Sequence, residues 1–144
     1  MAVFWCRIAH RGTHRDVMKP IGINLMYLRP GHVGGSEVYC RELIRGLNGL
    51  GVPLRLFCTQ EAADTFEAMS DVDICVLSTG GYRLRQRLWS ENGLLAAELY
   101  RHPVRVLHSP GNFGAPLIPS RVPQVITVHD LQHCLLYTSP SPRD

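Results

Sequence analysis

The sequence lacks several features that would place it in a special class of proteins. Its cysteines are an odd number without paired spacing, which argues against a disulfide framework and against a zinc ribbon. No apolar run approaches the roughly 20 residues that a membrane-spanning helix needs. Residues 1–16 place a short apolar patch before the charges, the reverse of a signal peptide. We therefore expect a cytoplasmic protein, with its cysteines as small apolar filler. These cysteines are Cys6, Cys40, Cys58, Cys75 and Cys134.

Lysine is almost missing. Of the 15 basic residues, only Lys19 is a lysine and the other 14 are arginines, against a formal net charge of only +3. A surface that follows nucleic-acid phosphates usually mixes both residue types, so codon bias explains this composition better. We expect no nucleic-acid partner.

The length and composition predict a single globular domain. The chain has 144 residues, of which 45% are hydrophobic, enough for one core. Met18 directly precedes an apolar run, as a start residue would before a first strand, whereas residues 1–17 have no coherent period. We expect 1–17 to be a non-native or disordered extension and 18–133 to be the domain.

The last residues, 134–144 (CLLYTSPSPRD), have no periodicity. A consistent choice of codons turns all of them into a transposase-type sequencing adapter read in frame. We expect this segment to be adapter-derived and exclude it from the reasoning on fold. The alternative is a natural tail rich in proline and serine.

The hydrophobic pattern between 18 and 133 alternates between strands and helices. Apolar runs predict strands, helical spacing predicts helices, and turn residues separate them. The predicted strands are 21–27, 53–59, 72–78, 104–109 and 122–129, and the predicted helices are 36–50, 62–69 and 82–101. Alternation of this kind predicts an α/β fold, a Rossmann-like parallel sheet with helices on both faces, whose ligands gather at the carboxyl ends of the strands.

A glycine loop follows the first predicted strand. Gly31, Gly34 and Gly35 precede a helix in which Ser36 is a candidate N-cap and Glu37 lies in the first turn. Such a loop offers backbone amides to a phosphate. The spacing is neither G-x-G-x-x-G nor a P-loop, so a plain tight turn is the alternative.

Histidines end the two last predicted strands. His108 and His129 both stand where a ligand of a parallel sheet would lie, and a structural role for His129 is the alternative. His129 and His133 superficially suggest an H-E-x-x-H zinc helix. We reject it because the segment follows a strand and has Asp130 in place of glutamate.

Two further charge patterns favour ordinary surface roles. Asp71 and Asp73 spell D-x-D, a motif that can hold a metal and a nucleotide sugar, but they stand before a strand rather than after one. We therefore expect these two carboxylates to cap a neighbouring element or to be solvated, rather than to hold a metal and a nucleotide sugar. Arg83, Arg85 and Arg87 are spaced by two and fan out on a helix, so a solvated turn is the default and contact with anionic lipid the alternative.

Four stretches taken together resemble the N-terminal domain of glycosyltransferase family 4 enzymes, which have the GT-B fold. They are 18–25 (MKPIGINL), 29–39 (RPGHVGGSEVY), 106–110 (VLHSP) and 125–131 (VITVHDL). The resemblance covers nearly all of 18–133, and its specificity comes from four motifs in the right order. It implies one half of a GT-B enzyme, with the second domain beyond residue 133.

The resemblance also implies a reaction and its residues. The family transfers a sugar with retention from a nucleotide-sugar donor to a glycan or lipid-linked acceptor, without an obligatory metal or other cofactor. By match, Gly34 and Gly35, with Gly31, approach the donor diphosphate, and His129 contacts the donor sugar as the catalytic residue. The weaker candidates for lining the site are Glu37, His108 and Asp130.

The resemblance leads to expectations about this chain as a whole. We expect it to be inactive without the second domain, and to expose an apolar edge if its sheet stops at the fifth strand. A lipid-linked acceptor would bring the protein to the inner face of the cytoplasmic membrane. A small non-catalytic nucleotide-binding module of Rossmann type is the alternative function, and a metal-dependent transferase using Asp71 and Asp73 is a third.

Overall fold

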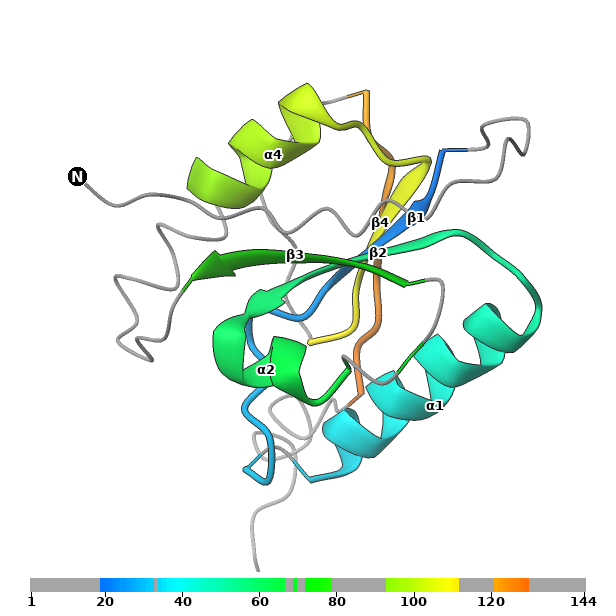
Figure 1. Ribbon diagram of the computed structural model, residues 1–144, viewed down its shortest axis with the longest axis vertical. Helices are drawn as coiled ribbons and strands as arrows, with labels where there is room; N and C mark the ends of the chain where they lie inside the picture. Colours follow the sequence, from blue (N-terminus) through cyan, green and yellow to red (C-terminus); the bar gives the residue numbers. More distant parts are fainter. Residues whose placement is uncertain are drawn as a thin grey trace, which may run out of the picture.

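The computed structural model describes residues 19–32, 34–66, 69, 72–78, 93–111 and 121–129. They form one parallel sheet of five strands in the order β3-β2-β1-β4-β5, with three helices (Figure 1). The elements are β1 (Ile21–Asn24), α1 (Gly35–Gly49), β2 (Leu54–Thr59), α2 (Gln60–Asp64), β3 (Val72–Ser78), α4 (Leu95–Arg101), β4 (Val106–Ser109) and β5 (Gln124–Ile126). This confirms the predicted α/β class and all five predicted strands.

The order of the strands reverses between β1 and β4. The chain passes from β1 outward to β2 and β3, then returns to the other side of β1 to form β4 and β5. In open parallel sheets, such a reversal leaves a crevice outside the carboxyl ends of the two central strands, and ligands bind there. The fold therefore points to the ends of β1 and β4.

Helices cover both faces of the sheet. Figure 1 shows α1 and α2 on one side of the strands and α4 on the other. Successive side chains of β2 alternate between the two cores, with Leu56 and Cys58 facing α1 and α2 and Phe57 facing α4. Such burial on both faces is the reason why the inner strands read as continuous apolar runs.

Helix α1 forms as its spacing predicts. Cys40 and Ile44 are fully buried against the sheet, one helical turn apart. The helix ends before Gly51, whose φ of +70° is the left-handed conformation that favours glycine. The N-cap prediction is wrong, because the cap is Gly34 without a side-chain hydrogen bond, and Ser36 lies inside the first turn.

Several predicted elements are shorter or shifted. Strand β5 covers only Gln124–Ile126 of the predicted 122–129, so His129 follows the strand and does not end it. Strand β1 ends at Asn24, three residues before the predicted end, because the Asn24 side chain accepts a hydrogen bond from the backbone N–H of Met26 at 3.2 Å and the chain turns. Helix α2 ends at Asp64 and begins at Gln60, where Thr59 caps it by accepting from the backbone N–H of Ala62.

Several predictions lie outside the described residues. They concern 1–17, most of the predicted helix 82–101, Asp71, Arg83, Arg85, Arg87, Asp130, His133 and 134–144. Among the residues that the structure does describe, no helix is long and apolar enough to cross a bilayer.

Candidate functional site

The candidate site lies at the carboxyl edge of the sheet. The glycine loop and the N-terminus of α1 follow β1, His108 is in β4, and His129 follows β5. In the sheet, His108 is in register with Ile23 of β1 and with Val125 of β5. Segments that are far apart in the sequence therefore meet at the edge that the strand order marks.

The glycine loop depends on glycine at two positions. Gly31 has φ +76° and Gly34 has φ +53°, both in the left-handed region, where a Cβ is strained. Gly34 and Gly35 are exposed, and a Cβ added at Gly35 would meet no atom within 4 Å. The start of α1 is therefore open in front of the helix, where its dipole and its first amides favour an anion.

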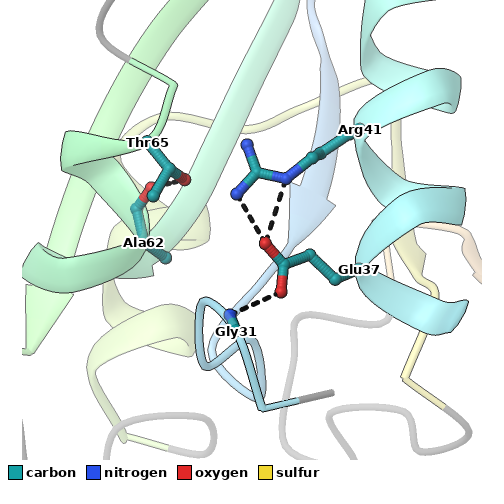
Figure 2. A network of polar contacts seen from close by, with 5 residues as sticks. All are labelled: Gly31, Glu37, Arg41, Ala62 and Thr65. Carbon is teal, nitrogen blue, oxygen red and sulfur yellow. Dashed lines mark hydrogen bonds and ion pairs between the residues drawn. The ribbon is translucent and has the colours of Figure 1, made fainter. Parts of the chain in front are cut away.

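Glu37 holds the glycine loop against α1. Its Oε2 accepts a hydrogen bond from the backbone N–H of Gly31 at 2.8 Å, and its Oε1 accepts from Nε and Nη2 of Arg41 at 3.0 and 2.6 Å (Figure 2). The Arg41 hydrogen bonds, followed by that from Gly31, hold the pKa of Glu37 below its ordinary value of 4.5. Glu37 thus stays ionised and fixes the loop.

Arg41 extends this network to α2. Its guanidinium carbon lies 5.2 Å from the centroid of the Phe66 ring, a cation–π distance. Figure 2 shows the two sides of the arrangement, with Glu37 and Arg41 on α1 and Thr65 bonded to Ala62 at the end of α2. Through Glu37 and Arg41, the loop that precedes α1 is therefore linked to Phe66, which is buried in the core between the sheet and helices α1 and α2.

A hydrogen bond from a ring nitrogen holds the His129 side chain in place. Its Nε2 lies 2.7 Å from the carbonyl oxygen of Pro110, which directly follows β4. A carbonyl can only accept, so Nε2 carries the proton. The ring of Tyr39 on α1 meets the imidazole edge to face, with centroids 4.8 Å apart and planes at 78°. His129 therefore contacts both the end of β4 and α1.

His108 is bonded to the same region. Its Nε2 lies 2.8 Å from Oγ1 of Thr127, whose hydroxyl also lies 3.4 Å from that of Tyr39. Burial lowers the pKa of His108 below its ordinary value of 6.5, and the charge of His129 lowers it further. The two predicted histidines are thus close enough for their charges to interact.

Buried polar contacts fix the ends of β1 and β4 beneath the histidines. Asn24 and Ser109 are buried, and the Asn24 amide donates to Oγ of Ser109 at 3.5 Å. The Tyr27 ring packs so closely on Gly111 that a Cβ there would lie 2.4 Å from it. The Tyr27 hydroxyl also lies 2.9 Å from the Cys40 sulfur, on α1. The segment that carries the Pro110 carbonyl therefore has little room to move.

Most of the predicted site residues lie at one edge of the sheet, whereas Asp73 of the predicted D-x-D motif does not. Gly31, Gly34, Gly35, Glu37, His108 and His129 all lie at the carboxyl ends of β1, β4 and β5 or in the α1 segment that follows β1. Asp73 lies on the outermost strand β3, and its Oδ2 is 2.6 Å from Nε of Arg55, its partner in register on β2. Within the described parts of the chain, no three His, Cys, Asp or Glu side chains gather as they would around a metal ion.

Sequence reasoning missed two side chains of this edge. Tyr39 stands in the motif that follows the glycine loop, and Thr127 stands two residues before His129. An exposed aromatic residue beside the buried face of an amphipathic helix was the only signal for Tyr39. Thr127 offered none, because its contact with His108 joins residues 19 positions apart.

Comparison with known proteins identifies a family for this chain. The family model described as Glycosyltransferase Family 4 matches residues 33–144, which is more than half of the chain. Neither the curated proteins nor the solved structures gave a match. The matched region contains α1, the two histidines and four of the five strands. On this match and on its parallel α/β sheet, the chain belongs to glycosyltransferase family 4.

Proposed function

We propose that this chain is the N-terminal, acceptor-side domain of a retaining GT-B glycosyltransferase. In this proposal the enzyme transfers a hexose from a nucleotide-sugar donor to a glycan or lipid-linked acceptor. The diphosphate of the donor lies before α1, against Gly34 and Gly35, and the sugar lies against His129. A lipid-linked acceptor would bring the enzyme to the inner face of the cytoplasmic membrane.

One observation carries the proposal. A helix N-terminus that is open at Gly35 and an imidazole fixed at Pro110 belong to the same edge of the sheet, and Tyr39 links them. Negative charge develops on the diphosphate as the glycosidic bond to the donor breaks. Amides at the start of a helix are oriented for that charge beforehand, so they stabilise the transition state without reorganisation.

We propose that the reaction needs no metal. The helix N-terminus supplies partial positive charge where a metal-dependent enzyme would place a cation. The alternative metal motif is unsuited in its described half, because Asp73 forms an ion pair with Arg55 on β3 and β2, on the other side of β1 from both histidines. Donor binding should therefore be unchanged by EDTA.

We also propose that the 144-residue chain does not transfer sugar by itself. A GT-B site lies in a cleft between two Rossmann-like domains, and in this proposal Gly34, Gly35 and His129 belong to one wall of that cleft. The expected result of a transfer assay with labelled UDP-glucose or GDP-mannose is no product. Measurable sugar transfer by the purified chain would contradict this part of the proposal.

The role of the glycine loop is testable with a matched pair of variants. Gly35→Ala places a methyl group in open space in front of α1, whereas Gly49→Ala adds one in open space at the other end of the same helix. Neither meets a protein atom, so both should fold. We expect Gly35→Ala to weaken binding of UDP-glucose or GDP-mannose by about tenfold or more, since about 1.4 kcal/mol is lost when a phosphate can no longer approach.

The outcome separates the proposal from its alternatives. Equal binding by both variants would leave the loop as a plain turn. A non-catalytic nucleotide-binding module predicts that UDP or GDP binds as tightly as the nucleotide sugar and that His129→Ala has no effect. The transferase predicts weaker binding of the nucleotide sugar by His129→Ala, with His102→Ala, an exposed histidine after α4, as the control.

A further inference from the structure

Tyr39 joins α1 to the segment that follows β5. It lies in the second turn of α1 and is 36% exposed, next to the fully buried Cys40. Its ring contacts the imidazole of His129, and its hydroxyl lies 3.4 Å from Oγ1 of Thr127. Thr127 in turn has the shorter bond, 2.8 Å, to Nε2 of His108. One aromatic side chain thus contacts His129 directly and is linked to His108 through Thr127.

The contacts of His129 complement each other. The hydrogen bond from Nε2 to the Pro110 carbonyl fixes one atom of the ring and the tautomer of the neutral imidazole, with Nδ1 as its acceptor nitrogen. The edge-to-face contact with Tyr39, at 78° between planes, restricts rotation of the ring about this hydrogen bond.

We infer that Tyr39 is a positioning residue, which holds the imidazole of His129 in one plane at a fixed separation from the N-terminus of α1. The inference rests on the proposed function in one respect, namely that His129 faces the donor sugar while α1 faces the diphosphate. A donor must meet both at once, so loss of their fixed separation lowers the fraction of molecules that are ready to bind.

Packing alone does not account for this side chain. The buried face of α1 is formed by Cys40 and Ile44, whereas Tyr39 remains partly in solvent and directs its ring and hydroxyl to two polar residues. The ring contact is the stronger of its two contacts, because 3.4 Å is long for a hydrogen bond between hydroxyls. The ring should therefore matter more than the hydroxyl.

The test uses the purified 144-residue chain with ¹⁵N-labelled histidine. NMR shifts of the two ring nitrogens report the tautomer of His129, and side-chain couplings report its rotamers. In the wild type and in Tyr39→Phe we expect one tautomer, protonated on Nε2, and one rotamer. In Tyr39→Leu we expect averaged rotamers of His129, because only the ring contact is lost. The control is Tyr100→Leu, an exposed tyrosine on α4 whose ring lies 4.6 Å from the guanidinium of Arg121.

Backbone amide spectra of each variant check that the fold is retained. We expect Tyr39→Leu to fold, because the Tyr39 side chain is only partly buried. If folded Tyr39→Leu keeps His129 in the single wild-type rotamer, the inference is wrong. It is equally wrong if Tyr100→Leu mobilises His129 to the same extent, since the effect would then not depend on the contact.

A donor titration separates this inference from the proposed function. With UDP-glucose or GDP-mannose, we expect Tyr39→Leu to bind about 2- to 10-fold more weakly, the weight of one aromatic contact, and Tyr39→Phe to bind nearly as the wild type. If the wild type itself binds neither donor, the proposed function fails, while the histidine spectra still decide whether Tyr39 positions His129. If the wild type binds and Tyr39→Leu binds equally well, the inference alone fails.

Discussion

Strands β2 and β5 belong to the same parallel sheet, yet their side chains meet different surroundings. In β2, Leu56 and Phe57 are completely buried between helices on the two faces. In β5, Val125 and Ile126 are 51% and 47% exposed, and β4 is the neighbour with which β5 pairs among the described strands. The polar contacts of His108, Thr127 and His129 gather at the β5 side.

The difference shows that one part of the sheet stabilises the fold, whereas another part presents the polar groups of the candidate site. Buried apolar side chains between β2 and its helices hold the fold, and they leave no place for polar groups without partners. At the ends of β4 and β5, partial exposure lets imidazoles and hydroxyls bond to each other and still face a ligand.

Shortening an apolar side chain to alanine should lower the free energy of unfolding more in β2 than in β5. Leu56→Ala removes a side chain that is 0% exposed, and we expect the free energy of unfolding to fall by about 2–5 kcal/mol. Val125→Ala removes one that is half exposed, and we expect a change of about 0.5 kcal/mol or less. Urea unfolding followed by circular dichroism measures both. Similar losses in the free energy of unfolding would contradict the conclusion that β2 contributes more to stability than β5.

A single methyl group should disturb the junction beneath His129. In Gly111→Ala the new Cβ would lie 2.4 Å from the Tyr27 ring, so either the ring or the Pro110 segment must shift. We expect a loss of about 1–3 kcal/mol in the free energy of unfolding. Gly46→Ala, in open space on α1, is the control and should gain about 0.5–1 kcal/mol. The same urea experiment decides, and an unchanged Gly111→Ala would show that the junction is loose.

Acid should weaken the histidine edge before it weakens the glycine loop. Burial lowers the pKa of His108 below 6.5, so the unfolded chain binds a proton more readily than the folded one. This contribution is complete above pH 6.5 and is lost as the pH falls below it. Glu37, whose pKa lies below 4.5, gives a contribution that is complete above pH 4.5 and is lost as the pH falls through its lowered value.

Unfolding free energies measured from pH 7.5 down to about pH 2 should therefore fall in two stages. In His108→Asn the first stage should shrink, while in Glu37→Gln the second should shrink. A first stage of the same size in His108→Asn would mean that other groups cause it.

The exposed edge should affect association more than stability. Val125, Ile126 and Val128 are each about half exposed, at 51%, 47% and 56%, and an apolar sheet edge favours pairing with a second chain. We expect the wild type to self-associate as its concentration rises, and Val125→Lys to reduce this with little change in the free energy of unfolding. Size-exclusion chromatography over a range of concentrations measures it. A wild type that stays monomeric throughout would refute the expectation.

The sequence predicted the elements better than it predicted their ends. Strand β3 has the predicted bounds, because turn-forming residues flank its apolar run. Strand β1 is shorter than predicted, since Leu25, Met26 and Leu28 are buried like strand residues but follow the turn that Asn24 makes. Apolar periodicity measures burial, and burial continues past the last residue of the strand, where the chain already turns.

Periodicity and turn residues are local properties, so they were enough to predict the α/β class, the position of the glycine loop and the edge of the sheet at which His108 and His129 lie. The contacts of Tyr39 with His129, of Thr127 with His108 and of Glu37 with Gly31 arise only from tertiary packing. Contacts at the carboxyl edge depend on the strand order β3-β2-β1-β4-β5, which places β4 and β5 beside β1. That order is set by the packing of helices on both faces, and local sequence does not encode it.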